Sequence, residues 1–135
     1  MNRSTARETI MQMLYQMEIQ CDFSDEAKIS YIQNNIEEDN QIDFINLVAD
    51  SCLKNKTEID NIIEQFSKGW KISRIAKVDL SILRLCIAEC KFAADPTPVG
   101  VAISEAVKIA KKYGTEDSAK FINGILGSFA KSNGN

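Results

Sequence analysis

The sequence predicts an all-α protein of seven helices, and three observations support this prediction. Only two prolines occur, Pro96 and Pro98, and both lie in one short stretch, so the rest of the chain is free to form helices. No segment alternates apolar and polar residues between turn residues, as hairpin strands do. Apolar residues instead recur at spacings of three and four, which is the period of a helix with one buried face.

Four helices are expected in the first half of the chain. The first begins near Thr5, because Thr5 and Glu8 have the spacing of a capping box. Its buried face is expected to carry Ile10, Met13, Leu14, Met17 and Cys21. The second spans about 25–37 with Ile29 facing inward, and the third spans about 42–55. The fourth begins at Thr57 and ends at Lys68-Gly69, where a glycine cap is expected.

Three helices are expected in the second half. The helix over about 77–93 follows a possible turn at about 72–75 and is apolar on most sides, so it should be the central and most buried one. The next helix begins at Pro98, with Thr97 as its N-cap, and ends at Gly114. The last helix runs from about Asp117 to Ala130.

The length and charge distribution indicate one domain with two unlike halves. A chain of 135 residues favours a single domain, here divided near Gly69 into helical halves 1–69 and 70–135. Residues 1–66 hold 5 Lys/Arg and 13 Asp/Glu, whereas residues 67–135 hold 11 and 6. This asymmetry can give one surface an affinity for anions that the net charge of −3 conceals, although solvated helix faces would also account for it. No apolar run suits a membrane span or a signal peptide, so we expect a cytoplasmic protein without a membrane partner.

The residues give no indication of an enzyme. The absence of histidine excludes His-containing zinc sites and Ser-His or Cys-His nucleophile pairs. The cysteines lack the CxxC spacing of metal sites and are expected to be small buried residues: Cys21, Cys52, Cys86 and Cys90. Neither GxxxxGK[ST] nor GxGxxG is present, so no phosphate loop is indicated. We expect no catalysis, no metal and no cofactor.

The last predicted helix carries an unusual outer face. On a helical wheel of about 100° per residue, Phe121 lies about 90° from the centre of the apolar stripe. Asp117, Lys120 and Gly124 lie further round, on the outer face. Phe121 is either an aromatic at the edge of the core or a platform on which an RNA base stacks. In the second case Lys120 would meet phosphate and Gly124 would allow close approach, which would explain a helical glycine that costs about 1 kcal/mol relative to alanine.

The first predicted helix has a similar outward aromatic and a basic start. Tyr15 points about 130° away from the apolar stripe, by the same helical pitch. Arg3 and Arg7 lie at or before the first turn, where free backbone N–H groups attract anions. A second basic strip surrounds Trp70 and consists of Lys68, Lys71, Arg74 and Lys77. That strip either faces phosphate or is a solvated connection with Trp70 tucked into the core.

Two long segments resemble one known family. These are "VDLSILRLCIAEC" and "PVGVAISEAVKIAKKYGTEDSAKFINGIL", and the opening "ARETIMQMLYQMEI" is similar to the same family's first helix. They resemble the NusB family of bacterial transcription antitermination proteins, densely over 74–129 and moderately over 3–20. The resemblance implies two three-helix-bundle-like halves, no catalysis, and binding of single-stranded boxA RNA together with the ribosomal protein NusE. It also implies a place in the RNA polymerase elongation complex.

The resemblance assigns candidate site residues by position. Those implied to contact RNA are Arg3, Arg7, Tyr15, Asp117, Lys120, Phe121 and Gly124. Asp79 and Arg84 match the region where the RNA and NusE meet. Ser4 and Thr5 stand where relatives often carry arginines, so fewer cations are available to phosphate. We therefore expect a flatter salt dependence of RNA binding, by about 0.7 for each phosphate that has no cation to meet it.

Two alternatives to an RNA-binding factor remain open at this point. The chain could be a protein-binding helical adaptor that has lost most of its RNA affinity. It could also form a homodimer through the outer faces of the first and last helices, which would cover Tyr15 and Phe121. The sequence does not decide between a monomer and a homodimer.

Overall fold

The computed structural model describes residues 1–132, and this part of the chain contains seven α-helices and no strand, as predicted. Their bounds are α1 Arg3–Gln20, α2 Asp25–Asn35, α3 Ile42–Lys54, α4 Lys56–Phe66, α5 Lys77–Ile87, α6 Val99–Tyr113 and α7 Ser118–Ser132. A 3₁₀-helix, η1 (Ile72–Arg74), precedes α5, and a π-helix, η2 (Ala88–Phe92), follows it. Within residues 1–132, none of the helices combines the length and apolar composition needed to cross a bilayer.

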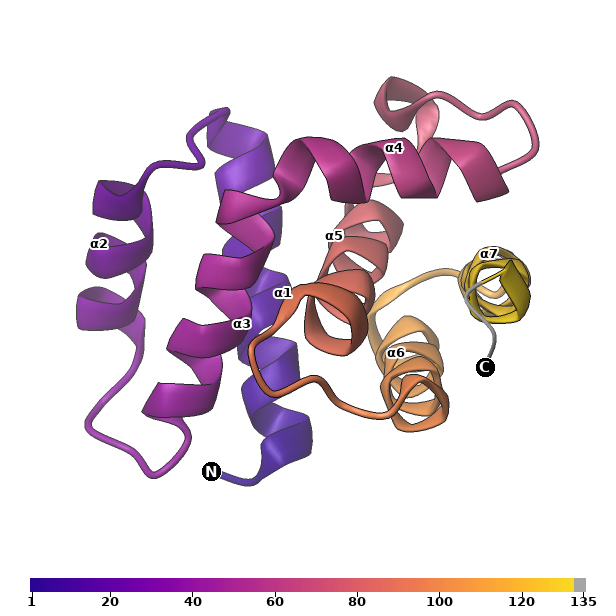
Figure 1. Cartoon of the computed structure of the whole chain (residues 1–135). Helices are drawn as coiled ribbons and strands as arrows, with labels where there is room; N and C mark the ends of the chain where they lie inside the picture. The colour runs from indigo at the N-terminus through magenta and orange to yellow at the C-terminus, as the bar shows by residue number, and fades with distance from the viewer. Residues whose placement is uncertain (133–135) are drawn as a thin grey trace.

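The centre of the fold is α5, as the sequence predicted. Every residue from Asp79 to Glu89 is buried. In Figure 1, α1 and α3 lie on one side of α5, α6 and α7 lie on the other, and α4 crosses one end. Because α1 packs against α5, the two predicted halves of the chain contribute to one shared apolar core.

One arginine links α5 to two helices of the N-terminal half, α1 and α4. Arg84 is 1% exposed, and its Nε and Nη2 donate to the two carboxylate oxygens of Asp60 on α4 at 2.8 and 3.0 Å. Its Nη1 donates to Oε1 of Glu18 on α1 at 2.5 Å. Burial disfavours the charge on Glu18, but the hydrogen bond and positive charge of Arg84 outweigh burial and lower the pKa of Glu18. Each nitrogen of the buried guanidinium therefore donates to a carboxylate oxygen.

A second buried pair joins α1 to the π-helix. Arg7 donates from Nε to both oxygens of Glu89 at 2.9 Å and from Nη2 to Glu89 Oε2 at 2.6 Å. Its Nη1 also meets Glu105 of α6 at 3.2 Å, and the Thr97 hydroxyl donates to Glu89 Oε2 at 2.6 Å. The bond from the Ala93 N–H to the carbonyl of residue 88, at 2.9 Å, has the i→i+5 spacing of the π turn that carries Glu89.

Two predicted helix starts were wrong because their polar side chains have other partners. The N-cap of α1 is Asn2, whose Oδ1 accepts from the Thr5 N–H at 2.8 Å. Glu8 does not complete a capping box but accepts from the Tyr113 hydroxyl at 2.7 Å. Thr97 bonds Glu89 instead of capping α6, which begins at Val99.

Two predictions of buried residues were also wrong. Cys21 is exposed and ends α1 in the left-handed conformation, with φ of 53°. Ile29 of α2 is exposed, and no residue of that helix is fully buried. Cys52 and Cys86 are buried as expected, and burial raises the pKa of the Cys52 thiol to about 12. That thiol is therefore protonated and unreactive at neutral pH.

We predict that Gly114→Ala destabilises the protein. A Cβ at Gly114 would lie 2.5 Å from both Cβ and Oγ of Ser118 and 2.8 Å from the Ala110 carbonyl oxygen, so α6 and α7 would have to separate. The expected loss is about 1–3 kcal/mol, measured by urea unfolding. Gly127→Ala is the matched control, because nothing lies within 4 Å of its Cβ; it should gain about 1 kcal/mol. Equal midpoints for the two variants would contradict the close approach.

We predict that Arg84→Met lowers the free energy of unfolding by about 3–5 kcal/mol at neutral pH, because it leaves two carboxylates without their buried partner. Glu18 has a lowered pKa in the folded protein, so the stability it gains from Arg84 is present above its unfolded pKa and is lost as the pH falls through the folded pKa. The difference between wild type and variant should therefore narrow in acid. A difference that is constant from pH 7 to pH 3 would refute this account.

Candidate nucleic-acid interface

Three adjoining hollows form one continuous surface along the start of α7. The first, of about 430 Å³, reaches from Tyr15 to Ser118, and the second, of about 380 Å³, shares Asp79 and Ser118 with it. The third, of about 240 Å³, shares Trp70 and Phe121 with the second. We call this surface the aromatic rim; its defining residues are Tyr15, Trp70, Asp79, Ser118, Phe121 and Gly124.

Two aromatic side chains stand together in the middle of the rim. Trp70 is 50% exposed, and its ring meets that of Phe121 edge-on, with centroids 6.4 Å apart and planes at 80°. The connection before it bends at Lys68 and Gly69, with φ of 53° and 95°, and the Ser67 hydroxyl donates to the Trp70 carbonyl at 2.7 Å. Trp70 is therefore not tucked into the core, because half of its surface is open to solvent.

Four exposed cations line the hollows at this aromatic pair or adjoin it in the chain. They are Lys68, Lys71, Arg74 and Lys120. Within residues 1–132, no carboxylate lies within ion-pair distance of any of the four, whereas Lys112 pairs with Glu8 at 2.9 Å. Their positive charge is therefore available to an anion that approaches Trp70 and Phe121.

The start of α7 places the predicted outer face next to this pair. The Thr115 N–H donates to the Ser118 Oγ at 2.9 Å, which fixes the entry to the helix. Lys120 and Gly124 are exposed, and Phe121 is partly buried. Asp117 is exposed just before the first turn. The wheel drawn from the sequence therefore placed these four residues correctly.

One residue of the aromatic rim is a buried acidic side chain. Asp79, in the first turn of α5, is 8% exposed and lines both the first and the second hollow. Among the described residues, its Oδ1 has no hydrogen-bond partner. Burial raises the pKa of Asp79, and the nearby Ser118 hydroxyl offsets part of that effect.

Three predicted site residues lie away from the rim. Arg7 and Arg84 are 5% and 1% exposed and are held in the ion pairs described above, so neither guanidinium is open to direct contact. Arg3 is exposed, but it lies twelve positions before Tyr15, which is about 18 Å along α1. Its Nε donates to Gln41 at 2.7 Å, and its guanidinium lies 4.0 Å from the Phe44 ring centroid. Sequence reasoning omitted Trp70 from the candidate site, although the acid-free basic strip around it was a usable signal.

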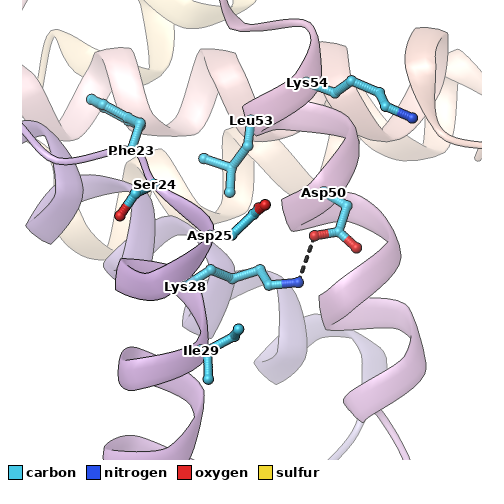
Figure 2. A pocket seen from close by; sticks show the side chains of 8 residues that line it. All are labelled: Phe23, Ser24, Asp25, Lys28, Ile29, Asp50, Leu53 and Lys54. Carbon is cyan, nitrogen blue, oxygen red and sulfur yellow. Dashed lines mark hydrogen bonds and ion pairs between the residues drawn. The ribbon is translucent and has the colours of Figure 1, made fainter.

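A separate hollow of about 730 Å³ lies between α2 and α3 (Figure 2). An ion pair crosses it, with Lys28 Nζ and Asp50 Oδ1 at 2.6 Å. None of the predicted site residues lines this hollow. The rim is therefore the only one of these two places where the sequence prediction and the geometry coincide.

Comparison with known proteins gives one consistent result. The sequence model of the NusB family matches residues 4–131. The transcription antitermination protein NusB of Acetivibrio thermocellus is 48% identical, over 97% of this chain and 90% of its own. A solved structure of T. maritima NusB has a TM-score of 0.85 at 32% identity, covering 97% of this chain and 92% of that one.

A solved structure of antitermination factors NusB and NusE in complex with dsRNA is also similar, with a TM-score of 0.83 at 28% identity and 96% of each chain covered. Sequence and fold thus agree over nearly the whole length. The chain belongs to the NusB family.

Proposed function

We propose that this protein is a transcription antitermination factor that binds single-stranded, boxA-type RNA together with NusE in the RNA polymerase elongation complex. The names of its relatives support this function, as does the similar structure that contains NusB, NusE and RNA. The observation that carries the proposal is the aromatic rim, where exposed cations lie near the exposed rings of Tyr15 and Trp70 and the partly buried ring of Phe121. Rings that stack on bases beside cations that meet phosphate are what single-stranded RNA requires.

Different residues of the aromatic rim contact different parts of the RNA in this proposal. Tyr15 and Phe121 offer stacking surfaces, each worth about 1–3 kcal/mol per base. Lys120 meets phosphate, and Gly124 lets the backbone of the RNA come close to α7. The Asp117 carboxylate accepts a hydrogen bond from a ribose hydroxyl or a base amine, donors that RNA carries in addition to its phosphates.

In this proposal Arg3 and Arg7 lie outside these direct contacts. Arg3 extends the binding surface toward the N-terminus of α1, for RNA longer than the rim. Arg7 holds α1 against η2 and α6, and so fixes the direction in which Tyr15 points. NusE is assigned to the surface beside Asp79 and Arg84; because both side chains are buried, it would meet their exposed neighbours on α5, such as Lys77.

A binding measurement with and without the partner tests this function. We expect fluorescence anisotropy to detect boxA-type RNA bound to the protein with NusE present, and more weakly in its absence. Binding of NusE without any RNA binding would favour the protein-binding adaptor instead. Sedimentation velocity of the free protein addresses the homodimer, which would bury Tyr15 and Phe121 and compete with RNA.

We predict that Arg74→Gln combined with Lys120→Gln weakens RNA binding, because two fewer cations meet phosphate. The slope of log affinity against log salt should flatten by about 1.4, at about 0.7 per phosphate for a single strand. Lys54→Gln is the matched control, since Lys54 is exposed and lines the hollow between α2 and α3 (Figure 2). An unchanged slope in the double variant, or an equal change in the control, would show that phosphate is bound elsewhere.

We predict that Gly124→Ala makes the protein more stable but a weaker RNA binder. No atom lies within 4 Å of a Cβ at Gly124, so the helix should gain about 1 kcal/mol. The added methyl group should hinder close approach and reduce RNA affinity severalfold. Gly127→Ala gives the same helix gain without the RNA effect, because Gly127 does not line the rim. Wild-type affinity in Gly124→Ala would disprove the close approach.

A further inference from the structure

The hollow between α2 and α3 has no part in the proposed RNA binding (Figure 2). Its volume of about 730 Å³ exceeds that of each hollow of the aromatic rim and is within the range of ligand-binding clefts, about 300–1,000 Å³. None of the residues that define the rim lines it. Any ligand of this hollow therefore binds at a second, separate surface.

Apolar side chains of this hollow are open to solvent, because α2 is only partly covered by its neighbours. No residue of α2 is fully buried, and Ile29 in the middle of that helix is 49% exposed. Phe23 and Leu53 are partly buried, and Figure 2 shows Leu53 of α3 lining the same hollow as Ile29. An open apolar groove between two helices is the kind of surface on which an amphipathic helix of a partner docks.

The charge of the two helices restricts the kind of partner. Residues 25–54 hold 7 Asp/Glu and only 2 Lys. Both lysines line the hollow, where Lys28 is paired with Asp50 at 2.6 Å and Lys54 lies in the last turn of α3. Asp25 also lines the hollow, so the charges of its lining balance. The excess of acids therefore lies beyond the lining, along the rest of the groove.

Much of that excess gathers where α2 joins α3. Figure 1 shows the connection 36–41 at the end of the two helices opposite the α3 C-terminus. Glu37, Glu38 and Asp43 are exposed there, and no cation among residues 1–132 lies within ion-pair distance of any of the three. Arg3 bonds Gln41 instead. A basic partner would offset this local repulsion, whereas an acidic partner or a nucleic acid would add to it.

We propose that the groove between α2 and α3 docks a basic amphipathic helix of a protein partner. Apolar side chains of that helix cover Ile29 and Leu53, and its lysines or arginines meet the acids at the connection 36–41. This inference goes beyond the proposed function and does not rest on it. Because the groove and the aromatic rim share no residue, the partner helix and RNA can be bound at the same time.

Three synthetic peptides test the occupant, each about 14 residues long, or about four helical turns. The first places leucines on one helix face and lysines on the other. The second has the same composition with leucines on all sides, and the third replaces every lysine by glutamate. We expect NMR titration of the ¹⁵N-labelled full chain to show shifts at the amides of Ile29 and Leu53. The first peptide should bind at least about tenfold more tightly than either of the others.

Ile29→Ser tests the apolar contact. It should weaken the first peptide about 3- to 12-fold, because half of an isoleucine side chain remains to be buried by the partner. Ile19→Ser is the matched control, since Ile19 of α1 is 51% exposed and lies outside the hollow. Circular dichroism checks that both variants are folded. An equal loss in the two variants overturns the proposed groove.

Glu37→Gln tests the charge contact without touching the apolar floor. It should weaken the first peptide and flatten the salt dependence of its binding. Glu116→Gln removes the same charge at an exposed position between α6 and α7 and should leave both unchanged. Equal effects of the two variants would show that the peptide responds only to net charge and would overturn the docking site.

Other occupants give distinguishable results. If the Ile29 and Leu53 amides shift with protein concentration alone, and sedimentation shows a dimer, a second copy of the chain covers the groove and the proposal is wrong. If boxA-type RNA shifts the same amides, the groove binds nucleic acid and the proposal is wrong as well. Wild-type RNA binding by Ile29→Ser, with the first peptide weakened, supports two separate surfaces. Loss of RNA binding in wild type would refute the proposed function and leave the peptide result intact.

Discussion

The fold depends on keeping α5 buried on nearly all sides while charged side chains, Arg84 above all, are buried with it. An apolar helix alone could rotate or slide against its neighbours, since burial of apolar area has no direction. Arg84 removes that freedom because its planar guanidinium must meet Asp60 and Glu18 at the same time. One side chain thereby fixes the position of α5 against α4 and α1. The positions of the surface residues that α5 carries follow from it.

The candidate site is a product of this packing. Asp79 lies one turn and a residue before Arg84 on α5, so the pairs that orient Arg84 also place Asp79 below α7. The tight contact between Gly114 and Ser118 brings the start of α7 over it. The connection through Ser67 and Gly69 brings Trp70 to the same place from the junction between the two halves of the chain. Segments distant in sequence thus form one surface.

Much of the fold and part of the candidate site were predictable from local sequence patterns. Helical periodicity located the seven helices, the central position of α5 and the outer face of α7, because these depend on residues three or four apart. The partners of Arg7 lie 82 and 98 positions away, so no local rule could distinguish a buried arginine from one that faces phosphate. The predicted capping role of Glu8 was wrong for the same reason, since its partner Tyr113 lies 105 positions away. The Thr97 hydroxyl bonds Glu89, eight positions earlier, and so does not cap α6. Trp70 was left open because exposure of a loop residue is set by tertiary packing.

Because of the π turn after α5, the ion pair between Arg7 and Glu89 depends on the number of residues in this segment. With one residue fewer, an ordinary α-helical turn would close there, and every later side chain would rotate by about 100° around the axis. If the missing residue preceded Glu89, that carboxylate could no longer face α1, and Arg7 would keep only Glu105 as a carboxylate partner. Relatives that keep this arginine inside should therefore tolerate substitutions around the turn more readily than a change in its number of residues.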